Sequence, residues 1–456
     1  MPQPNASRPD RPPLRISIRA PRLIGTIAIA AALSLTAAAC GSSGGSPGAE
    51  GNGKGKIVFW DNNGGVRTAV WKQIIAAFEK KYPQIKVEYV GIPITDVQKK
   101  YDTAAAGGGL PDVGGVGTAY LADLVAQGVL APLKDRIDAG PLKGKLVKGM
   151  VSSVQAAGGH DQQMYSVPTS ANEGTLWYRK DLFAAAGLQP PTTWAAFYRA
   201  AARLTDPAHD KFGFTIRGGK GSIAQALEMM YAQSGIGSFW EDGKTTVNDP
   251  RNIAALEKYA ALYKKATPAA DLNNDFVNMV SEFDQGDVGM LQHNLGSYND
   301  HVKAFGKDKI EGVPLPAPQD GGAPTIVSEP VDGLGIFTSS KHKAAAWKFI
   351  EFADSAPMNS LWNQSAGAIP ANTDAAAAQW IQDAKSTKAA MDSLNSPHTK
   401  VVQLPYYLPD WNSISKAESE PEFQKLFLGK VTAKSFADTL ADKLNSAQAD
   451  YVKHKG

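Results

Sequence analysis

The chain has 456 residues, 43% of them hydrophobic, so it is long enough and apolar enough for two or three domains with cores of their own. Lys and Arg total 47 against 44 for Asp and Glu, and this near balance excludes the basic footprint of a nucleic-acid-binding protein. The single cysteine, Cys40, excludes an intrachain disulfide, so hydrophobic packing has to supply the stability.

Residues 1–39 have the three parts of a signal peptide. A region with five arginines is followed by the apolar residues 23–36, which are too few to span a membrane. Ala37, Ala38 and Ala39 then precede Cys40, and this resembles the lipobox at which lipoprotein signal peptidase cuts before a cysteine that receives diacylglycerol. We therefore expect a lipid at Cys40 and a position on the outer face of the cell membrane. The alternative is an ordinary A-x-A secretory site followed by a free thiol.

The next segment, residues 40–55, is rich in glycine and serine (GSSGGSPGAEGNGKG after the cysteine). Such a composition buries nothing and predicts a flexible tether that reaches roughly 20 Å. Beyond the leader, no apolar run reaches the roughly 18 residues that a membrane-spanning helix needs.

The folded part is predicted to begin with a strand at residues 56–61, a helix at 68–80 and a strand at 85–90. A strand, helix, strand unit implies a parallel sheet and hence the α/β class. Further along the chain, apolar periodicity and turn residues predict strands that begin near 111 and 174 and helices at 96–106, 120–127, 180–186, 194–204, 253–265, 343–355, 375–384 and 435–452.

The chain also carries, in this order, KIVFWD with NNGG, FEKKYPQIKVEYV, GGLPDV, MYSVPTSANEGTLWYRKDLFAAAGLQPPTTWAAF, FDQGDVGMLQHNLGS, and AAWKFIEFADS with GAIP. This series resembles the extracellular solute-binding proteins of the maltose-binding type. The resemblance implies a type II periplasmic-binding-protein fold, in which two α/β lobes are joined by three crossings and the ligand binds in the cleft between them. It also implies a non-enzymatic, monomeric substrate-binding component of an ABC importer, with a sugar as ligand, a permease as partner and no cofactor.

Carried onto this chain, the crossings fall near residues 169–174, 319–326 and 366–371. The N-terminal lobe would then combine 56–171 with 324–368, and the C-terminal lobe would combine 172–323 with 369–456. Hinge closure would remove the ligand from water while both lobes contact it.

A sugar needs carboxylates, amides and aromatic rings together, and the loops at the carboxyl ends of parallel strands are the places to look for them. Asp61, Asn62 and Asn63 leave the first strand and match the family's first sugar-contacting loop, although Asx residues before two glycines also form turns. Asp112 and Tyr120 are further candidates, with a helix cap and core packing as their respective alternatives.

More candidates follow at and beyond the first crossing. Asn172 and Glu173 match the position of a sugar-binding acid, with a solvated surface charge as the alternative. Arg217 precedes two glycines, and its guanidinium would bind a sugar carboxylate or neutral hydroxyls, or else form a salt bridge between the lobes. The remaining candidates are Trp240, for which burial in the core is the alternative, the polar stretch with His293, Asn294 and Ser297, then Asp332 beside the second crossing, and Trp411 as a stacking aromatic.

The polar residues 292–298 stand where relatives have a tryptophan after Gly-Pro, which favours a mono- to trisaccharide over a long maltodextrin. His293 has no carboxylate partner at metal-ligand spacing, so no metal site is expected. An acidic or non-carbohydrate solute, such as a sugar acid or a glycerol phosphodiester, is the main alternative ligand. A secreted glycoside hydrolase would need two paired carboxylates, which the sequence does not present, and an adhesin would show repeats.

Overall fold

The computed structural model describes residues 50–455 apart from residues 66, 160–162 and 319–323. The predicted signal peptide, Cys40 and most of the tether lie outside the described residues. Within the described ranges, no helix is both long and apolar enough to cross a membrane.

The first lobe is built on a six-stranded mixed sheet with the strand order β12-β4-β11-β3-β1-β2. Pairing is parallel between β1 and both β2 and β3, and antiparallel for β11 with β3 and β4 and for β12 with β4. The strands are β1 (Gly55–Asp61), β2 (Ile85–Gly91), β3 (Val113–Gly115), β4 (Val167–Ala171), β11 (Asp332–Ile336) and β12 (Ile369–Pro370). The predicted parallel strand, helix, strand unit is therefore confirmed.

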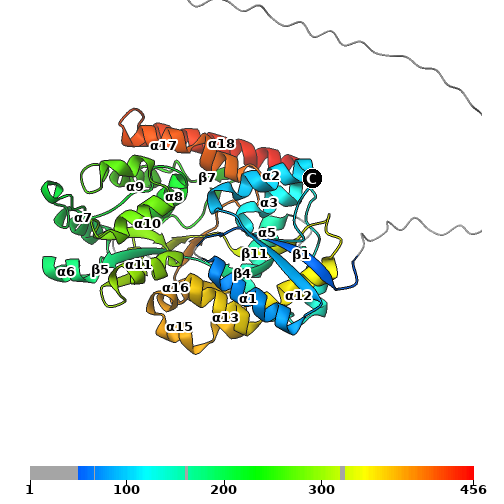
Figure 1. The fold of residues 1–456 in the computed structure, drawn as a ribbon. Coiled ribbons are helices and arrows are strands. Elements are labelled where there is room, and N and C mark those ends of the chain that lie inside the picture. The colour runs from blue at the N-terminus through cyan, green and yellow to red at the C-terminus, as the bar shows by residue number, and fades with distance from the viewer. Residues whose placement is uncertain (1–49, 66, 160–162, 319–323, 456) are drawn as a thin grey trace, which may run out of the picture. The chain divides into compact units, whose positions relative to one another are not determined.

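Helices cover both faces of this sheet, and Figure 1 shows α1, α12 and α13 on one side with α2 and α3 on the other. An aromatic cluster joins the sheet to the first group: the ring of Phe59 in β1 lies 4.7 Å from Trp71 and 5.3 Å from Phe349. The helices are α1 (Thr68–Lys81), α2 (Val97–Gly107), α3 (Thr118–Ala126), α4 (Lys134–Ala139), α5 (Lys148–Gly158), α12 (Lys343–Ala353), α13 (Ala356–Ala366) and α14 (Thr373–Ala376).

The second lobe has smaller sheets than the first lobe. Its main sheet is antiparallel, with the order β8-β5-β9, and it is accompanied by a parallel pair, β10 with β13, and a hairpin, β6 with β7. The strands are β5 (Gly174–Arg179), β6 (Trp240–Glu241), β7 (Lys244–Thr245), β8 (Met290–Asn294), β9 (Ile310–Pro314), β10 (Thr325–Val327) and β13 (Lys400–Val402).

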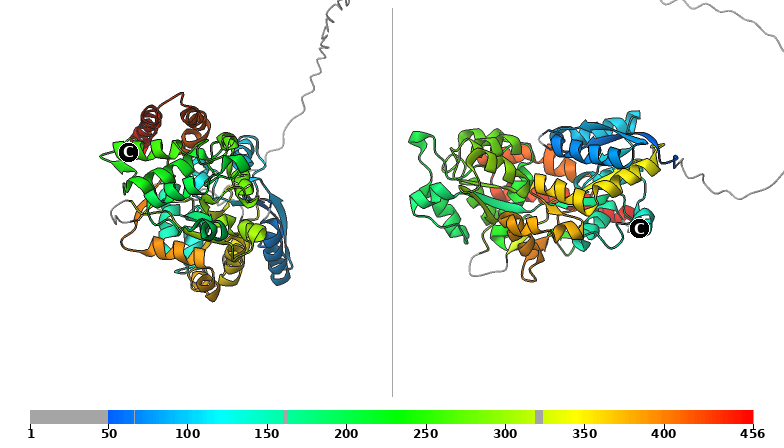
Figure 2. Two further views of the ribbon diagram at one scale, coloured as in Figure 1. Left: turned by 90° about the vertical axis from the view of Figure 1, so that its left-hand side faces the viewer. Right: turned by 60° about the horizontal axis from the view of Figure 1, so that its bottom comes forward.

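Part of the second lobe is built around a core of its own that includes Phe197, Phe214, Tyr231, Tyr259 and Phe423, whereas Met279 and Phe283 of α10 pack in the cluster that continues into the first lobe. In the right-hand view of Figure 2 the blue and yellow elements of the first lobe lie at one end and the green elements of the second at the other. The helices are α6 (Lys180–Ala186), α7 (Trp194–Arg203), α8 (Ser222–Ser234), α9 (Pro250–Ala260), α10 (Phe276–Asp284), α11 (Tyr298–Phe305), α15 (Gln379–Asp383), α16 (Lys385–Asn395), α17 (Glu420–Phe427) and α18 (Ala433–Lys455).

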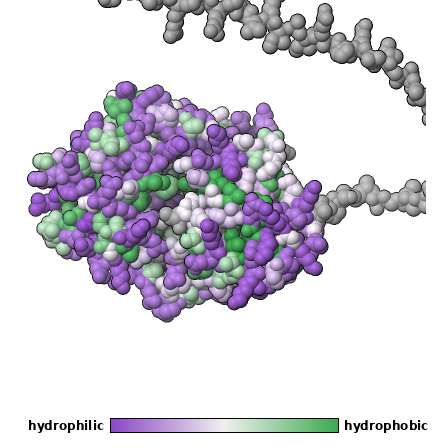
Figure 3. Space-filling model, in the orientation of Figure 1, coloured by the Kyte–Doolittle hydropathy of each residue, from purple (hydrophilic) through white to green (hydrophobic). Residues whose placement is uncertain are grey.

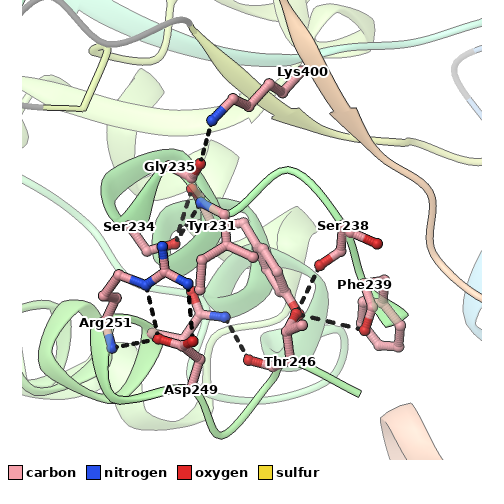
Figure 4. Close-up of polar contacts among 11 residues, drawn as sticks. Tyr231, Ser234, Gly235, Ser238, Phe239, Thr246, Asp249, Arg251 and Lys400 are labelled. Atoms are coloured by element: carbon pink, nitrogen blue, oxygen red, sulfur yellow. Dashed lines mark hydrogen bonds and ion pairs between the residues drawn. The ribbon is translucent and has the colours of Figure 1, made fainter. Parts of the chain in front are cut away.

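Polar contacts at the C-terminal end of α8 join distant parts of the second lobe (Figure 4). The Tyr231 hydroxyl lies 2.8 Å from the Thr246 hydroxyl, and Lys400 of β13 donates to the carbonyl of Gly235 at 3.0 Å. The first of these contacts satisfies two buried hydroxyl groups, and the second, which is exposed, links β13 to the end of the helix.

Most predicted helices are present, with shifted ends. The helix expected at 253–265 is α9, which begins at Pro250 because Asp249 accepts a hydrogen bond from the Arg251 amide and caps it. The helix expected at 375–384 is divided into α14 and α15, and the helix expected at 435–452 is extended in α18.

The chain passes from β4 of the first sheet to β5 of the second through Asn172 and Glu173. The second crossing lies later than predicted. Thr325–Val327 pair with β13 and Val327 packs in the second core, whereas β11 pairs with the first sheet, so the chain crosses at residues 328–331. Assigning residues 324–327 to the first lobe was therefore wrong.

The third crossing is also later than residues 366–371. β12 pairs with β4, and the Thr373 amide donates to the Lys145 carbonyl at 2.8 Å, so residues 369–376 remain with the first sheet. The chain reaches the second lobe with α16, where the Ser386 hydroxyl accepts from the Gly312 amide of β9. Strands of two or three residues carry too little pattern to be placed from sequence, which explains both displaced boundaries.

Candidate functional site

The loop after β1 is fixed by its own polar groups. The Asp61 carboxylate accepts from the Tyr89 hydroxyl at 2.7 Å and from the Asn63 amide at 3.0 Å. Burial raises the pKa of Asp61, while the Tyr89 bond acts in the opposite direction. Asn62 is buried against Gly115, where a Cβ would overlap its side-chain oxygen. The turn alternative and the site prediction therefore describe the same residues, since the turn holds Asp61 and Asn62 at the carboxyl end of β1.

Asp332 starts β11 next to this loop. Its carboxylate accepts from the Ser170 hydroxyl at 3.4 Å and is hydrogen-bonded to Asn62. Burial raises the pKa of Asp332, and the nearby Arg67 guanidinium partly offsets this. The structure thus brings three predicted residues, Asp61, Asn62 and Asp332, to one edge of the first sheet.

Arg67, which the sequence analysis did not single out, lies between the two lobes. Its guanidinium carbon lies 5.7 Å from the ring centre of Trp362 in α13, and a Cβ on Gly296 of the second lobe would meet its Nη2 at 2.6 Å. The charge of Arg67 acts on Asp61 and Asp332 of the first lobe and on His293 of the second. A basic residue in the same loop as Asp61 was a signal that could have found it.

Trp362 was missed as well. It is almost fully buried, its ring centre lies 4.8 Å from that of Trp71, and its indole Nε1 has no partner among the described residues. An aromatic face beside a guanidinium and an unpaired N–H donor are two of the groups that recognise a sugar.

On the second lobe, Arg217 and His293 present buried polar atoms without partners in the described part of the chain. Arg217 Nη1 donates to the Gly221 carbonyl at 3.3 Å, while its Nε is buried and unpaired. His293 stacks on Phe276 with ring centres 5.8 Å apart, and its Nδ1 is buried and unpaired. Burial, with the charge of Arg217, holds the pKa of His293 well below its ordinary value, so the imidazole is neutral at physiological pH.

Asn172, in the first crossing, adds a third such group, because its side-chain oxygen is buried and has no partner within the described ranges. Next to it on the chain, Glu173 lies in a small cavity lined also by Glu228, Thr325 and Ser393. Burial raises the pKa of Glu173 to about 9, so this side chain is protonated at neutral pH. The structure therefore gives the two neighbouring candidates different surroundings.

Other predicted residues make local contacts. Asn294 accepts from the Gly296 amide at 3.1 Å through its side chain, and the Ser297 hydroxyl donates to the Asn294 carbonyl at 3.1 Å. These bonds shape the turn that carries Gly296 toward Arg67. Tyr120 is buried in the first turn of α3, and the Nζ of Lys416 lies 5.9 Å from its ring centre.

Two predicted site residues have structural partners instead. Asp112 precedes β3, and its carboxylate accepts from the Val58 amide at 2.8 Å and from the Ser340 hydroxyl at 2.6 Å. Trp411 is buried in the second core against Phe239 and Tyr406, which is a core position and not a stacking platform. Trp240 lies in the β6–β7 hairpin, which packs against α18, and its indole Nε1 is buried without a partner among the described residues.

Contacts between the lobes bring these groups opposite one another. Asn412 donates to the Gln98 side chain at 3.1 Å, and Asn299 of α11 donates to the Ser365 carbonyl at the end of α13. The face in Figure 3 has a middle band of hydrophobic and near-neutral residues surrounded by hydrophilic ones. Among the described residues, no cluster of three or more His, Cys, Asp or Glu side chains is arranged to hold a metal ion.

The fold, with its two α/β lobes, its three crossings and polar groups facing each other across the crossings, is that of a type II periplasmic-binding protein. Residues 64–359 match the family of bacterial extracellular solute-binding proteins, and the chain belongs to this family.

Three known proteins show the range of the similarity. The putative ABC transporter periplasmic-binding protein YcjN of Escherichia coli is 26% identical over 314 residues, which cover 67% of this chain and 70% of the relative. The GacH receptor of Streptomyces glaucescens, solved with acarbose, has a TM-score of 0.76 at 23% identity and covers 87% of this chain and 99% of its own. A solute-binding protein of Agrobacterium vitis with bound D-mannitol has a TM-score of 0.70 at 25% identity and covers 88% of this chain and 99% of its own.

Proposed function

We propose that this protein is the lipid-anchored, substrate-binding component of an ABC importer. It captures a small sugar or sugar alcohol, of one to three units, by closing its lobes, and it passes the solute chemically unchanged to the permease. A sugar-type ligand is consistent with the acarbose and D-mannitol bound by the two structural relatives.

The observation that carries this proposal is a group of three buried polar atoms, among those without partners in the described part of the chain, that lie at the first crossing and on the second lobe. Arg217 Nε donates, Asn172 Oδ1 accepts, and the neutral imidazole of His293 does either. Leaving such a group buried and unsatisfied costs about 1–3 kcal/mol. Hydroxyl groups of a solute both donate and accept, so one polyhydroxylated ligand would satisfy all three groups.

Closure follows from the same argument. A ligand shifts a hinge equilibrium only through a difference in affinity for the two states. Asp61, Asp332 and Arg67 come from the first lobe and Arg217 and His293 from the second, so only the closed form offers both sets to one solute.

The test is a thermal-unfolding screen of the purified chain against monosaccharides, disaccharides, trisaccharides and sugar alcohols. A bound solute at about 100 times its Kd stabilises the folded state by about 2.7 kcal/mol. Chromatography of the recovered solute checks that it is intact. A screen without any stabilising sugar or sugar alcohol contradicts the proposed ligand class, and shortened oligosaccharides contradict a transport role.

The anchor is tested separately. We expect the wild-type chain in the membrane fraction of the producing cell and the Cys40→Ser variant in the soluble extracytoplasmic fraction. Equal amounts of both proteins in the soluble fraction would support the ordinary secretory site and a free thiol.

A second candidate ligand is a sugar acid or another anionic solute. It is favoured by two guanidinium groups, those of Arg67 and Arg217, neither of which lies within ion-pair distance of a described carboxylate. Arg217→Ala would then abolish binding of an anion such as gluconate but only weaken binding of D-mannitol. Retained affinity for the anion would refute this candidate.

A further inference from the structure

Two backbone segments of the second lobe carry the unpaired groups of Arg217 and His293, and these segments run side by side. Thr215 forms a parallel bridge with Leu291 of β8. Arg217 and His293 each follow two residues later, so the register of the two segments places them at neighbouring positions. Whatever joins the two backbones beyond this bridge therefore sets the spacing of the two side chains.

The side chain of Gln225, in the first turn of α8, joins the two backbones. Its Oε1 accepts from the Arg217 amide at 2.7 Å, and its Nε2 donates to the Gln292 carbonyl at 3.0 Å. Oε1 also accepts from the Tyr259 hydroxyl at 2.6 Å, and Nε2 also donates to the Met279 sulfur at 3.3 Å. Both acceptor positions and both N–H groups of this amide are thereby used.

The partners of Gln225 fix the orientation of its amide group. A backbone N–H only donates and a backbone carbonyl only accepts, so exchanging the oxygen and the nitrogen of the amide would break both backbone bonds at once. Gln225 is also buried, so bulk water does not replace a partner that is lost. The bridge between the two segments therefore has one arrangement.

The segment with Arg217 is held on its other side by Asp271. The Asp271 carboxyl group accepts from the Ile216 amide at 2.6 Å, and the Gly218 amide donates to the Asp271 carbonyl at 2.9 Å. A Cβ on Gly218 would meet that carbonyl oxygen at 2.5 Å, so the close approach requires glycine. Asp271 thus fixes the residues before and after Arg217, whereas Gln225 ties Arg217 itself to β8.

We propose that Gln225 is a positioning residue of the solute site, which sets the spacing between Arg217 and His293 without contacting the solute. This inference rests on the proposed function, because both residues are proposed ligand-binding groups. Gln225 has no hydrogen-bonding position left for a solute, whereas Arg217 Nε and His293 Nδ1 are buried and lack partners among the described residues. A fixed spacing of these two atoms favours solutes whose polar groups match it, since the site is organised before binding.

Hydrogen exchange and NMR spectroscopy on the full, solute-free chain test the bridge. Gln225→Met keeps an unbranched side chain of similar length and removes both backbone bonds. We expect exchange of the Arg217 amide to become about tenfold faster and the NMR signals of the His293 imidazole, assigned with His293→Phe, to shift. Gln225→Glu retains an acceptor oxygen, so exchange of the Arg217 amide should return to the wild-type rate.

A second glutamine on the same helix supplies a matched control. Gln233 Oε1 accepts from the Tyr198 hydroxyl at 2.8 Å, as Gln225 does from Tyr259, but Gln233 lies at the C-terminal end of α8. Gln233→Met should leave the Arg217 amide and the His293 signals as in the wild type. Gln225→Asn, which is one methylene too short to reach both backbone partners, is a second variant of the bridge, and circular dichroism reports whether each variant folds.

Unchanged Arg217 exchange and His293 signals in the folded bridge variants would overturn the proposal. Equal changes in Gln233→Met would also overturn it, because they would show a general effect of altering α8. Fast exchange of the Arg217 amide in Gln225→Glu would contradict the assigned acceptor. Because no solute is present, these outcomes are distinct from a failed sugar screen.

Discussion

The two sides of the candidate site differ in how their polar groups are satisfied. On the first lobe, Asp61, Asn62 and Asp332 are bonded to one another or to neighbours such as Tyr89 and Ser170. On the second lobe and the first crossing, Arg217, His293 and Asn172 have buried atoms without partners in the described part of the chain. We expect that Asp61, Asn62 and Asp332 are organised before a solute arrives and that the unpaired atoms of the second side are completed by the solute. The following variants test this difference.

The largest effect is expected for Trp362→Ala. Its side chain is almost fully buried against Trp71, so truncation should lower the free energy of unfolding by about 3–5 kcal/mol. Denaturant titration measures the change. The control is Trp380→Ala, at a half-buried position on α15, which should lower the free energy of unfolding clearly less. Equal losses of stability in the two variants would show that Trp362 does not belong to a fixed first side.

Asp61→Ala should destabilise the solute-free protein by about 1–3 kcal/mol, because the Asn63 amide and one bond of the Tyr89 hydroxyl lose their acceptor. Chemical denaturation without solute is the measurement. The exposed Asp96, substituted in the same way, should change stability by no more than about 0.5 kcal/mol. An unchanged midpoint for Asp61→Ala would mean that the first side is not organised by this carboxylate.

Asn172→Ala should not destabilise the solute-free protein, in contrast to Asp61→Ala. Removing a buried, unpaired oxygen should leave the solute-free protein as stable as before or about 1 kcal/mol more stable, while affinity for the solute falls about tenfold or more. Calorimetric titration and denaturation together separate the two effects. The control is Asn359→Ala, which removes bonds to Thr169 and Asp354 and should reduce stability. A loss of stability in Asn172→Ala comparable to that in Asn359→Ala would show that the two sides of the site do not differ in this way.

The smallest effect concerns His293 and acid. Its pKa is lowered in the folded state, so the stability that it contributes is present above the unfolded value of about 6.5 and is lost as pH falls below it. His293→Phe should therefore reduce the loss of stability between pH 6.5 and 5, whereas His209→Phe, at an exposed position, should not. The measurement is the thermal unfolding midpoint of each variant between pH 6.5 and 5. An equal fall in the midpoint for wild type and His293→Phe would contradict the prediction.

Much of the first side of the site was predictable. Residues 56–61 are apolar and are followed by Asx residues and two glycines, a local pattern that sets both the strand and the turn, and the structure places Asp61 and Asn62 where the pattern does. Asp332 could be predicted because the resemblance of the chain to the family placed this residue beside a crossing. In each case local sequence carries enough information.

Aromatic candidates were placed less well, because whether a tryptophan lines a cleft depends on which helices cover it. Trp411 lies in the second core and Trp240 in a hairpin beside α18, whereas Trp362, on a helix with no distinctive motif, lies beside Arg67. The periodicity of a helix gives the face of a residue but not the element that packs against that face.

The sequence by itself determined the α/β class and the strand, helix, strand unit at the start of the fold, since these follow from local patterns, and the order of motifs along the chain indicated the family. The tertiary structure alone decided where the chain crosses after β10 and after β12, the partners of Arg67 and the cavity that Glu173 and Glu228 share. The physical reason is that pairing of two- and three-residue strands, burial and the pKa values of carboxyl groups all depend on neighbours that are distant in the chain.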